Sequence, residues 1–371
     1  MSQHWIADRT QLFDSSGIRK VFDLAATMTD PINLSIGQPD FDVPEPIKSA
    51  AKRSIDAGKN GYAPTQGMAP LREKLQGQVD AKYGHADRKL LVTSGTSGAL
   101  TLLMYAAVNP GDEVILFDPY FVSYEPLVKL VGGRCVIVDS HPNFQIDVNK
   151  VREAITPRTK LILFNSPANP TGVVATEQVT SDLAALAAEK NVLLVSDEIY
   201  SRFAFDGEFV SPAKYNPATL VIDGFSKTYG MTGWRVGYVH GPSALVDGMT
   251  KLQQYTFVCA PQPFQWAGVE ALDFEMQPYI DAYRKKRDYV VEQLSRDYEL
   301  ATPGGAFYAY PKAPRGSGSS FVEEAIANQL LVIPGKIFSQ HDTHFRLSYA
   351  ASDATIERGM EVLRKLAKRS T

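Results

Sequence analysis

Lys227 lies in a short stretch, DGFSKTYGMTGWR (223–235), that combines one lysine, one arginine and three glycines and raises the question of whether the lysine does chemistry that its neighbours serve. Ser226 directly precedes the lysine, and Arg235 ends the stretch at the start of the next predicted strand. The stretch follows an apolar run, LVID (220–223), that predicts a strand. Most lysines are solvated on the surface, but a lysine among buried strand ends can lose its proton and act as an amine nucleophile. Other polar groups gathered at the same place would favour a buried, reactive lysine over a solvated one.

Two further polar motifs follow apolar runs in the same way. Asn169 lies in NSPANPTG (165–172) after LILF, and Asp197 lies in SDEIY (196–200) after VLLV. A carboxylate at the end of a buried run is costly unless it is paired, so Asp197 predicts a buried cation such as a protonated ring nitrogen. The alternatives are a plain turn at Asn169 and a helix-capping role for Asp197.

A fourth motif, SGTSGAL (94–100), is a small-residue turn that opens a helix-like stretch. The first amides of a helix and its positive end form a seat for phosphate, although these residues also suit a simple N-cap. Open α/β sheets bind ligands at the carboxyl ends of their strands, where all four motifs are predicted to lie.

The elements that must position these motifs alternate between strands and helices. Helix-like stretches cover 97–108 and 175–190, the second with Thr176 as N-cap and Asn191 after its last residue. Six apolar runs predict strands buried on both faces: VILF (114–117), CVIV (135–138), LILF (161–164), VLLV (192–195), LVID (220–223) and VGYV (236–239). The pattern predicts an α/β fold with a mostly parallel open sheet covered by helices.

The two ends of the chain differ from this centre and predict a second, smaller domain. Residues 1–45 are irregular and punctuated by proline, and a long charged helix begins near Pro278. We expect a large domain over 46–280 and a small α+β domain that joins the N-terminal segment 1–45 to residues 281–371. A ligand cleft is expected between them.

Composition excludes several classes of protein. The 371 residues carry a formal net charge of −3, which gives no basic surplus for binding nucleic acid. No apolar run approaches the roughly 20 residues that span a bilayer, and the N-terminus does not resemble a signal peptide. Cys135 and Cys259 are expected as buried free thiols in a reducing cytoplasm. His341 and His344 (HDTH) lack a cysteine or carboxylate at a recognised spacing, so no metal site is predicted.

Familiar nucleotide and hydrolase signatures are absent: no G-x-G-x-x-G, no G-x-x-x-x-G-K-[ST] and no G-x-S-x-G occurs. Eight other motifs stand in order along nearly the whole chain: SIGQPDF (35–41), GYAPTQG (61–67), SGTSGAL, DPYFVSY (118–124), NPTG, SDEIY, FSKTYGMTGWR and FRLSYA (345–350). With them the chain resembles pyridoxal-phosphate enzymes of fold type I, in the aspartate/aromatic-like class I/II aminotransferase family. The resemblance implies an aminotransferase that moves an amino group between an L-amino acid and a 2-oxo acid, with 2-oxoglutarate as acceptor, by a ping-pong mechanism.

The resemblance also assigns roles to single residues. Lys227 would hold the aldehyde of pyridoxal 5′-phosphate and move the proton during transfer, and Asp197 would pair with the ring nitrogen. Arg346 and Gly37, with Asn169, would bind the substrate carboxylate. The phosphate would be held by Ser226, Arg235 and the turn Gly95, Thr96 and Ser97, with Tyr62 contributed by the other subunit of a homodimer. Tyr200 and Asn169 would bind the ring oxygen. Phe121, rather than Tyr120, would stack on the ring face.

The amino donor stays open between aspartate, aromatic and neutral amino acids. Some aspartate-specific members of the family carry a lysine where this chain has Ser97, and Arg19 or Lys20 is a possible substitute cation. A pyridoxal-phosphate lyase, such as a carbon–sulfur β-lyase, is the alternative because it shares the lysine, aspartate and tyrosine set. A pyridoxal-phosphate-sensing regulator would need a basic DNA-binding domain, which the composition disfavours.

Overall fold

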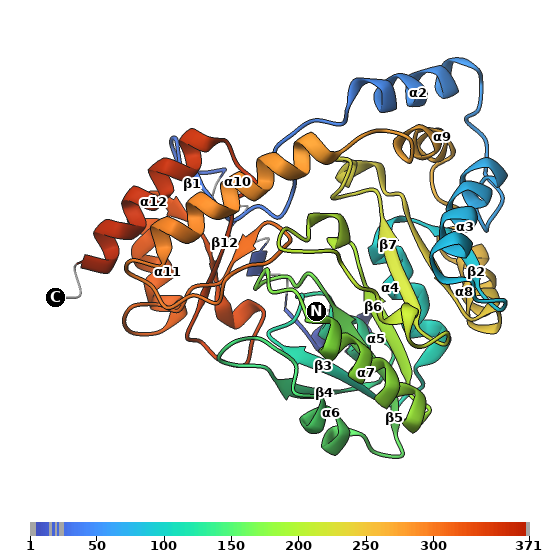
Figure 1. Ribbon diagram of the computed structural model, residues 1–371, viewed down its shortest axis with the longest axis horizontal. Helices are drawn as coiled ribbons and strands as arrows, with labels where there is room; N and C mark the ends of the chain where they lie inside the picture. Colours follow the sequence, from blue (N-terminus) through green and yellow to red (C-terminus); the bar gives the residue numbers. More distant parts are fainter. Residues whose placement is uncertain (1–4, 15–16, 19–20, 22–25, 369–371) are drawn as a thin grey trace.

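A seven-stranded sheet forms the centre of the protein, whose structure is a computed structural model (Figure 1). The structure describes residues 5–14, 17–18, 21 and 26–368, so Arg19 and Lys20 lie outside it. Strands β3 to β7 run parallel, while β8 is antiparallel to both of its neighbours. The mostly parallel open sheet is therefore confirmed. Its strands, in spatial order, are β2 (Lys89–Thr93), β8 (Gly237–Gly241), β7 (Leu220–Gly224), β6 (Leu193–Asp197), β5 (Thr159–Asn165), β3 (Glu113–Asp118) and β4 (Arg134–Asp139).

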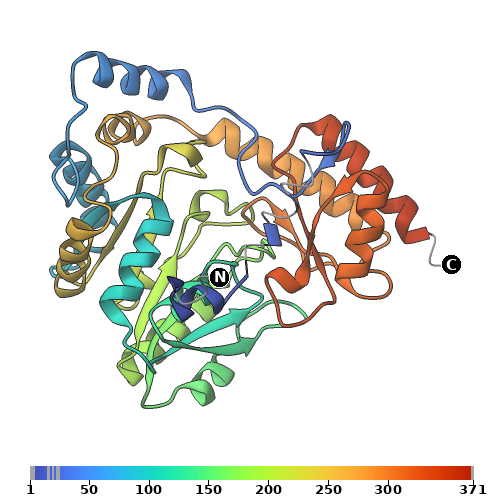
Figure 2. The same ribbon diagram turned by 180° about the vertical axis from the view of Figure 1, so that it is seen from behind.

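Helices cover both faces of this sheet, as Figures 1 and 2 show from opposite sides. One face packs against α4 (Gly95–Ala107), α5 (Tyr124–Leu130) and α8 (Ser243–Tyr255), and the other packs against α6 (Val148–Ala154) and α7 (Glu177–Lys190). The predicted ends of α7 are confirmed. The Thr176 side chain accepts the amide of Val179, and Asn191 adopts a left-handed conformation (φ 51°) after the last turn.

Two strands differ from the prediction. CVIV (135–138) lies in β4, which is an edge strand, so Cys135, Val136 and Ile137 are only partly buried rather than covered on both faces. An edge strand has a neighbour on one side only, and its outer side is less covered. Both cysteines are free, and both are partly rather than fully buried. Strand β2 was not predicted from its short run KLLVT.

Smaller sheets bring the two ends of the chain together. β1 (Ile32–Asn33) pairs with β10 (Leu330–Leu331), and β12 (Phe345–Ser348) lies between β11 (Ile333–Pro334) and β9 (Tyr308–Ala309). The helices α10 (Gln277–Leu294), α11 (Gly318–Ala327) and α12 (Asp353–Lys368) accompany them, in orange and red in Figure 1, with blue β1 beside them. This pairing supports our proposal that segment 1–45 joins the C-terminal part, although the proposed 280/281 boundary falls inside α10.

The remaining elements connect these two parts. Helix α2 (Glu45–Asp56) packs on α9 (Gln262–Ala271), and α3 (Ala69–Tyr83) lies beside them. Among the described residues, no helix has the length and apolar character needed to cross a membrane. Short 3-10 turns are η2 (Asp8–Gln11), η3 (Ser201–Phe203), η4 (Pro212–Lys214), η5 (Thr232–Trp234) and η6 (Gly335–Ile337).

Candidate active site

A cavity of about 240 Å³ lies at the carboxyl ends of β5, β6 and β7, next to β12. Parallel strands deliver their final residues to one edge of the sheet, which is why motifs far apart in sequence meet here. Eleven of the thirteen predicted site residues line this cavity: Gly37, Thr96, Ser97, Phe121, Asn169, Asp197, Tyr200, Ser226, Lys227, Arg235 and Arg346. Gly95, the residue before Thr96, does not line the cavity, and neither does Tyr62.

Lys227 follows β7 and reaches into the cavity. Its Nζ donates a hydrogen bond to the carbonyl oxygen of Gly37 at 2.6 Å. Burial lowers the pKa of the Lys227 amine to about 8, and the positive charges of Arg346 and Arg235 act in the same direction. A useful share of the amine is therefore uncharged near neutral pH, as a nucleophile or a proton acceptor requires.

Asp197 ends β6 and is buried beside the lysine's cavity. Burial raises the pKa of this carboxyl group to about 6, although the hydroxyl of Tyr124 donates to Oδ2 at 2.7 Å and the amide of Ile199 donates to Oδ1 at 3.3 Å. The side chain of Asn165 donates to the main-chain oxygen of Asp197 at 2.9 Å and fixes the strand end. A buried carboxyl group of this kind is stabilised in its charged form by a nearby cation.

The start of α4 and the side chain of Arg235 form a strongly positive corner. Gly95 has φ +68°, and a Cβ added there would lie 2.4 Å from Arg235 Nη2, so the guanidinium lies directly on the turn. The first amides of α4, at Thr96 and Ser97, have no acceptor within the helix. Two positive groups packed together, with the Ser226 hydroxyl nearby in the same cavity wall, predict an anion such as phosphate between them.

Arg346 comes from β12 and is almost fully buried. Its guanidinium lies between the rings of Tyr308 and Phe338, at 4.6 and 4.7 Å from their centroids. Nη1 donates to Asn169 Oδ1 at 3.0 Å and Nη2 donates to the carbonyl oxygen of Ser35 at 2.8 Å. Nε has no hydrogen-bond partner in the described part of the chain. A rigid arginine with donors to spare suits a bidentate carboxylate.

Tyrosine hydroxyls complete the wall near Arg346. Tyr200 shares a hydrogen bond of 2.8 Å with Tyr308, and a Cβ added at Gly37 would lie 2.5 Å from the Tyr308 hydroxyl. Glycine at position 37 therefore lets the N-terminal segment approach this tyrosine closely. Phe121 lines the cavity, with its ring 5.5 Å from Tyr124.

Sequence reasoning missed several residues of the wall. Tyr124 stands in the DPYFVSY motif, three residues after Phe121, so an aromatic residue inside a motif was the available signal. Tyr308 stands in GGAFYAYP (304–311), outside the eight motifs. Tyr120 points elsewhere, since its hydroxyl donates to Glu125 at 2.8 Å. The other missed residues are Ile18, Asn165, Ile199 and Thr232. Tyr62 is 85% exposed and is not brought to the cavity of its own chain.

Comparison with known proteins agrees with this geometry. Residues 29–363 match the family described as aminotransferase class I and II. The aspartate/prephenate aminotransferase of Thermus thermophilus is 38% identical over 358 residues, covering 92% of each chain. The aromatic-amino-acid aminotransferase 2 of Thermococcus litoralis is 33% identical and covers 98% of each chain.

A solved structure shares the fold over nearly its whole length. The aspartate aminotransferase from Thermus thermophilus with maleate superposes with a TM-score of 0.93 at 35% identity, covering 97% of this chain and 99% of that one. The sequence, the fold and the relatives agree, and the chain belongs to the class I and II aminotransferase family and is a transaminase.

Proposed function

We propose that the protein transfers an amino group between an L-amino acid and a 2-oxo acid with pyridoxal 5′-phosphate as its cofactor. The observation that carries this proposal is the shared cavity of Lys227, Asp197 and Arg346 together with the positive corner at α4. A reactive amine, a buried carboxylate, a carboxylate-binding arginine and a phosphate seat are the four groups that this reaction needs.

The cavity fits the cofactor in charge and in chemistry. Arg235, Ser226 and the first amides of α4 would hold the phosphate, and Asp197 would hold a proton on the ring nitrogen. Tyr200 and Asn169 would bind the ring oxygen, and Phe121 would cover the ring face. Pyridoxal phosphate, when bound, supplies an aldehyde that condenses with amines and a protonated ring that accepts the electron pair of the substrate α-carbon.

The chain's own residues would position the substrate and move the proton. Arg346 binds the α-carboxylate through its planar fork while Asn169 and Ser35 hold the guanidinium in place. Lys227 carries the proton to and from the α-carbon, a task that its lowered pKa supports. The Tyr124 hydroxyl orients Asp197 and favours its charged form.

The described lining supports a donor with an aromatic or other neutral side chain. The cationic side chains of this lining are Lys227, Arg235 and Arg346, and each already has a partner in the proposal. Ile18 and Tyr308 offer apolar surface for the donor side chain. Ser97 lines the cavity as a neutral residue and gives a second carboxylate no counter-charge.

We also propose a homodimer whose subunits share their active sites. The exposed aromatic residues Tyr62 (85% exposed) and Tyr255 (81%) lie on neighbouring segments, because Gln253 of α8 donates a hydrogen bond to the carbonyl oxygen of Thr65. Large exposed aromatic side chains support a protein interface. The free thiols of Cys135 and Cys259 support a reducing compartment, the cytoplasm.

A panel of amino donors assayed against 2-oxoglutarate tests the function. We expect the cofactor absorbance to shift with aromatic donors and glutamate to form, and sedimentation to give a dimer. Pyruvate and ammonia formed without a 2-oxo acid would instead identify a lyase. A higher kcat/KM for aspartate than for aromatic donors would contradict the proposed donor class.

A further inference from the structure

Two histidines and one carboxylate from distant parts of the chain meet where the large sheet borders the small ones. Asp139 ends β4, His141 follows it, and His341 lies in the segment between η6 and β12. One ligand atom from each of the three lies within 4.8 Å of the others. Sequence analysis found no carboxylate at a recognised spacing from these histidines, and Asp139 lies about 200 residues earlier in the chain.

The two measured separations lie on either side of the distance between ligand atoms around a small cation. Asp139 Oδ1 lies 2.7 Å from His141 Nδ1, and Asp139 Oδ2 lies 3.7 Å from His341 Nε2. Ligand atoms around a tetrahedral zinc ion lie about 3.3 Å apart, given bonds of about 2.0–2.1 Å. The side chains of Asp139 and His341 are each 48% exposed, so an ion can reach them and both can adjust.

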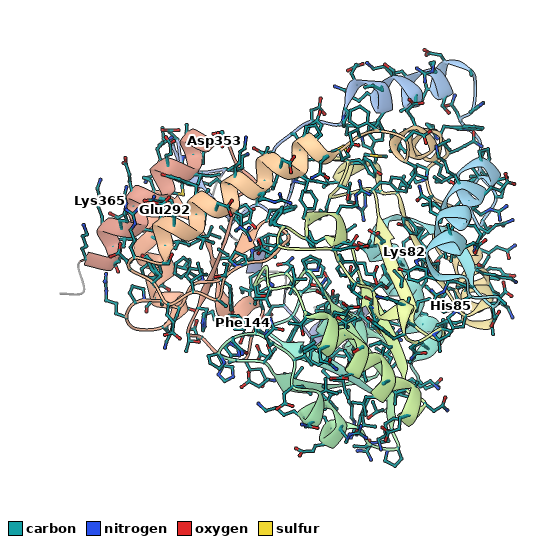
Figure 3. The ribbon with its side chains drawn as sticks, in the orientation of Figure 1. Lys82, His85, Phe144, Glu292, Asp353 and Lys365 are labelled. Carbon is teal, nitrogen blue, oxygen red and sulfur yellow. The ribbon has the colours of Figure 1, made fainter. Side chains whose placement is uncertain are left out.

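His141 gives the cluster its fixed member. Only 14% of its side chain is exposed, and Nε2 is buried without a hydrogen-bond partner in the described part of the chain. Its ring packs against Phe144 (5.0 Å between centroids) and His344 (5.5 Å). Figure 3 labels Phe144, which lies at the border between the large sheet and the small sheets. The nitrogen that faces Asp139 is Nδ1, which would exchange its hydrogen bond for the ion, and a neutral imidazole nitrogen is a frequent metal ligand.

The two segments that carry the cluster are held in place by one residue, Asp118, at the end of β3. The amide of Gln340 donates to Asp118 Oδ2 at 2.9 Å, and the hydroxyl of Ser140 donates to the Asp118 carbonyl oxygen at 2.6 Å. The neighbours of His341 and His141 are therefore fixed relative to each other. Such a frame lowers the cost of assembling a metal site.

We propose that Asp139, His141 and His341 bind a divalent transition-metal ion of the zinc type. Two imidazoles with one carboxylate favour such an ion over magnesium or calcium, which prefer all-oxygen sites. The ion would join the end of β4 to the segment that enters β12, five residues before Arg346. It would thus restrain the strand that carries the substrate-binding arginine. The proposal does not depend on the identity of the substrate or the cofactor.

Zinc binding to the full-length protein, purified without a histidine tag, tests this site. Competition with a chromophoric chelator measures stoichiometry and Kd for the wild type and for His341→Ala, Asp139→Asn and His85→Ala. His85 is a matched control because it lies on the other side of the molecule, as Figure 3 shows, and its ring bonds to the carbonyl oxygen of Ala213. Thermal unfolding with and without zinc chloride gives a second readout.

We expect the wild type and His85→Ala to bind one zinc ion per chain, and His341→Ala and Asp139→Asn to bind it about tenfold or more weakly. Zinc should raise Tm in the first pair and not in the second. Equal zinc affinity in the wild type and in His341→Ala would overturn the proposal. So would a wild type that fails to retain zinc against the chelator, since the three groups would then form only a hydrogen-bonded surface cluster.

Discussion

Replacing Arg346 with lysine keeps the positive charge and removes the planar fork. Arg346 uses Nη1 and Nη2 to hold Asn169 and Ser35, so its position is fixed before a substrate arrives. A lysine in this buried place has one nitrogen and cannot bind both anchors and a carboxylate in the same geometry. We expect the loss of one hydrogen bond to a charged group, about 1.5–3 kcal/mol.

This free energy corresponds to a KM for the amino donor that is about 10- to 150-fold higher. Steady-state kinetics over a range of donor concentrations gives KM and kcat separately. Absorbance of the cofactor, which we propose is bound by Lys227, should stay unchanged, because Arg346 is not among the proposed cofactor contacts.

Arg287→Lys is the matched control. Arg287 is also buried and forms a fork, with two bonds of 2.7 Å to Asp206 and one of 2.8 Å to the Pro303 carbonyl oxygen, but it does not line the cavity. It should lower Tm and leave KM unaltered. If Arg346→Lys has the KM of the wild type, or if both variants raise KM equally, the assignment of Arg346 to the substrate carboxylate is wrong.

Three further substitutions test the rest of the site and the fold. Asp197→Ala should abolish transamination and weaken cofactor retention, since leaving one member of a buried ion pair alone costs about 3–5 kcal/mol; near-normal turnover would contradict this. Gly95→Ala should raise the cofactor concentration needed for half-saturation, because the added Cβ would meet the Arg235 guanidinium. Gly84→Ala is its control: Gly84 has a similar φ of +64° but open space around it, so this change should only lower Tm. Burial raises the pKa of Asp223 to about 7, so ionisation disfavours the folded state and stability falls as pH rises from about 4 to 7. The Tm of Asp223→Asn should therefore fall less than the Tm of the wild type between about pH 4 and pH 7. Parallel curves of Tm against pH would show that the pKa of Asp223 is not raised.

Local signals predicted the elements well. Thr176 and Asn191 mark the ends of α7 because capping depends on the few residues at each end. Asn169, Asp197 and Lys227 were predicted to meet because parallel strands share one carboxyl edge, and the cavity confirms their meeting. The roles themselves came from the resemblance to the family and stay predictions.

Contacts across the chain were beyond reach of the same reasoning. Nothing near Arg346 in the sequence indicates that the Ser35 carbonyl oxygen and the Tyr308 ring will hold it. Likewise, an apolar run does not reveal whether its strand has two neighbours, which is why β4 was expected to be fully covered. The contact between Asp139 and His341 was missed for the same reason, because only the packed fold brings such distant segments together.

The pairing of β1 with β10 has a consequence for the order in which the protein is made. Ile32 meets Leu330, about 300 residues later, and a ribosome adding roughly 5–20 residues per second needs roughly 15–60 s to cover that distance. All strands of the large sheet have been synthesised by Gly241, long before β10 and β12 exist. During synthesis, Lys227 and the residues of the proposed phosphate seat thus exist while Arg346 is still missing, and a chain stopped early would lack the arginine that we assign to the substrate carboxylate.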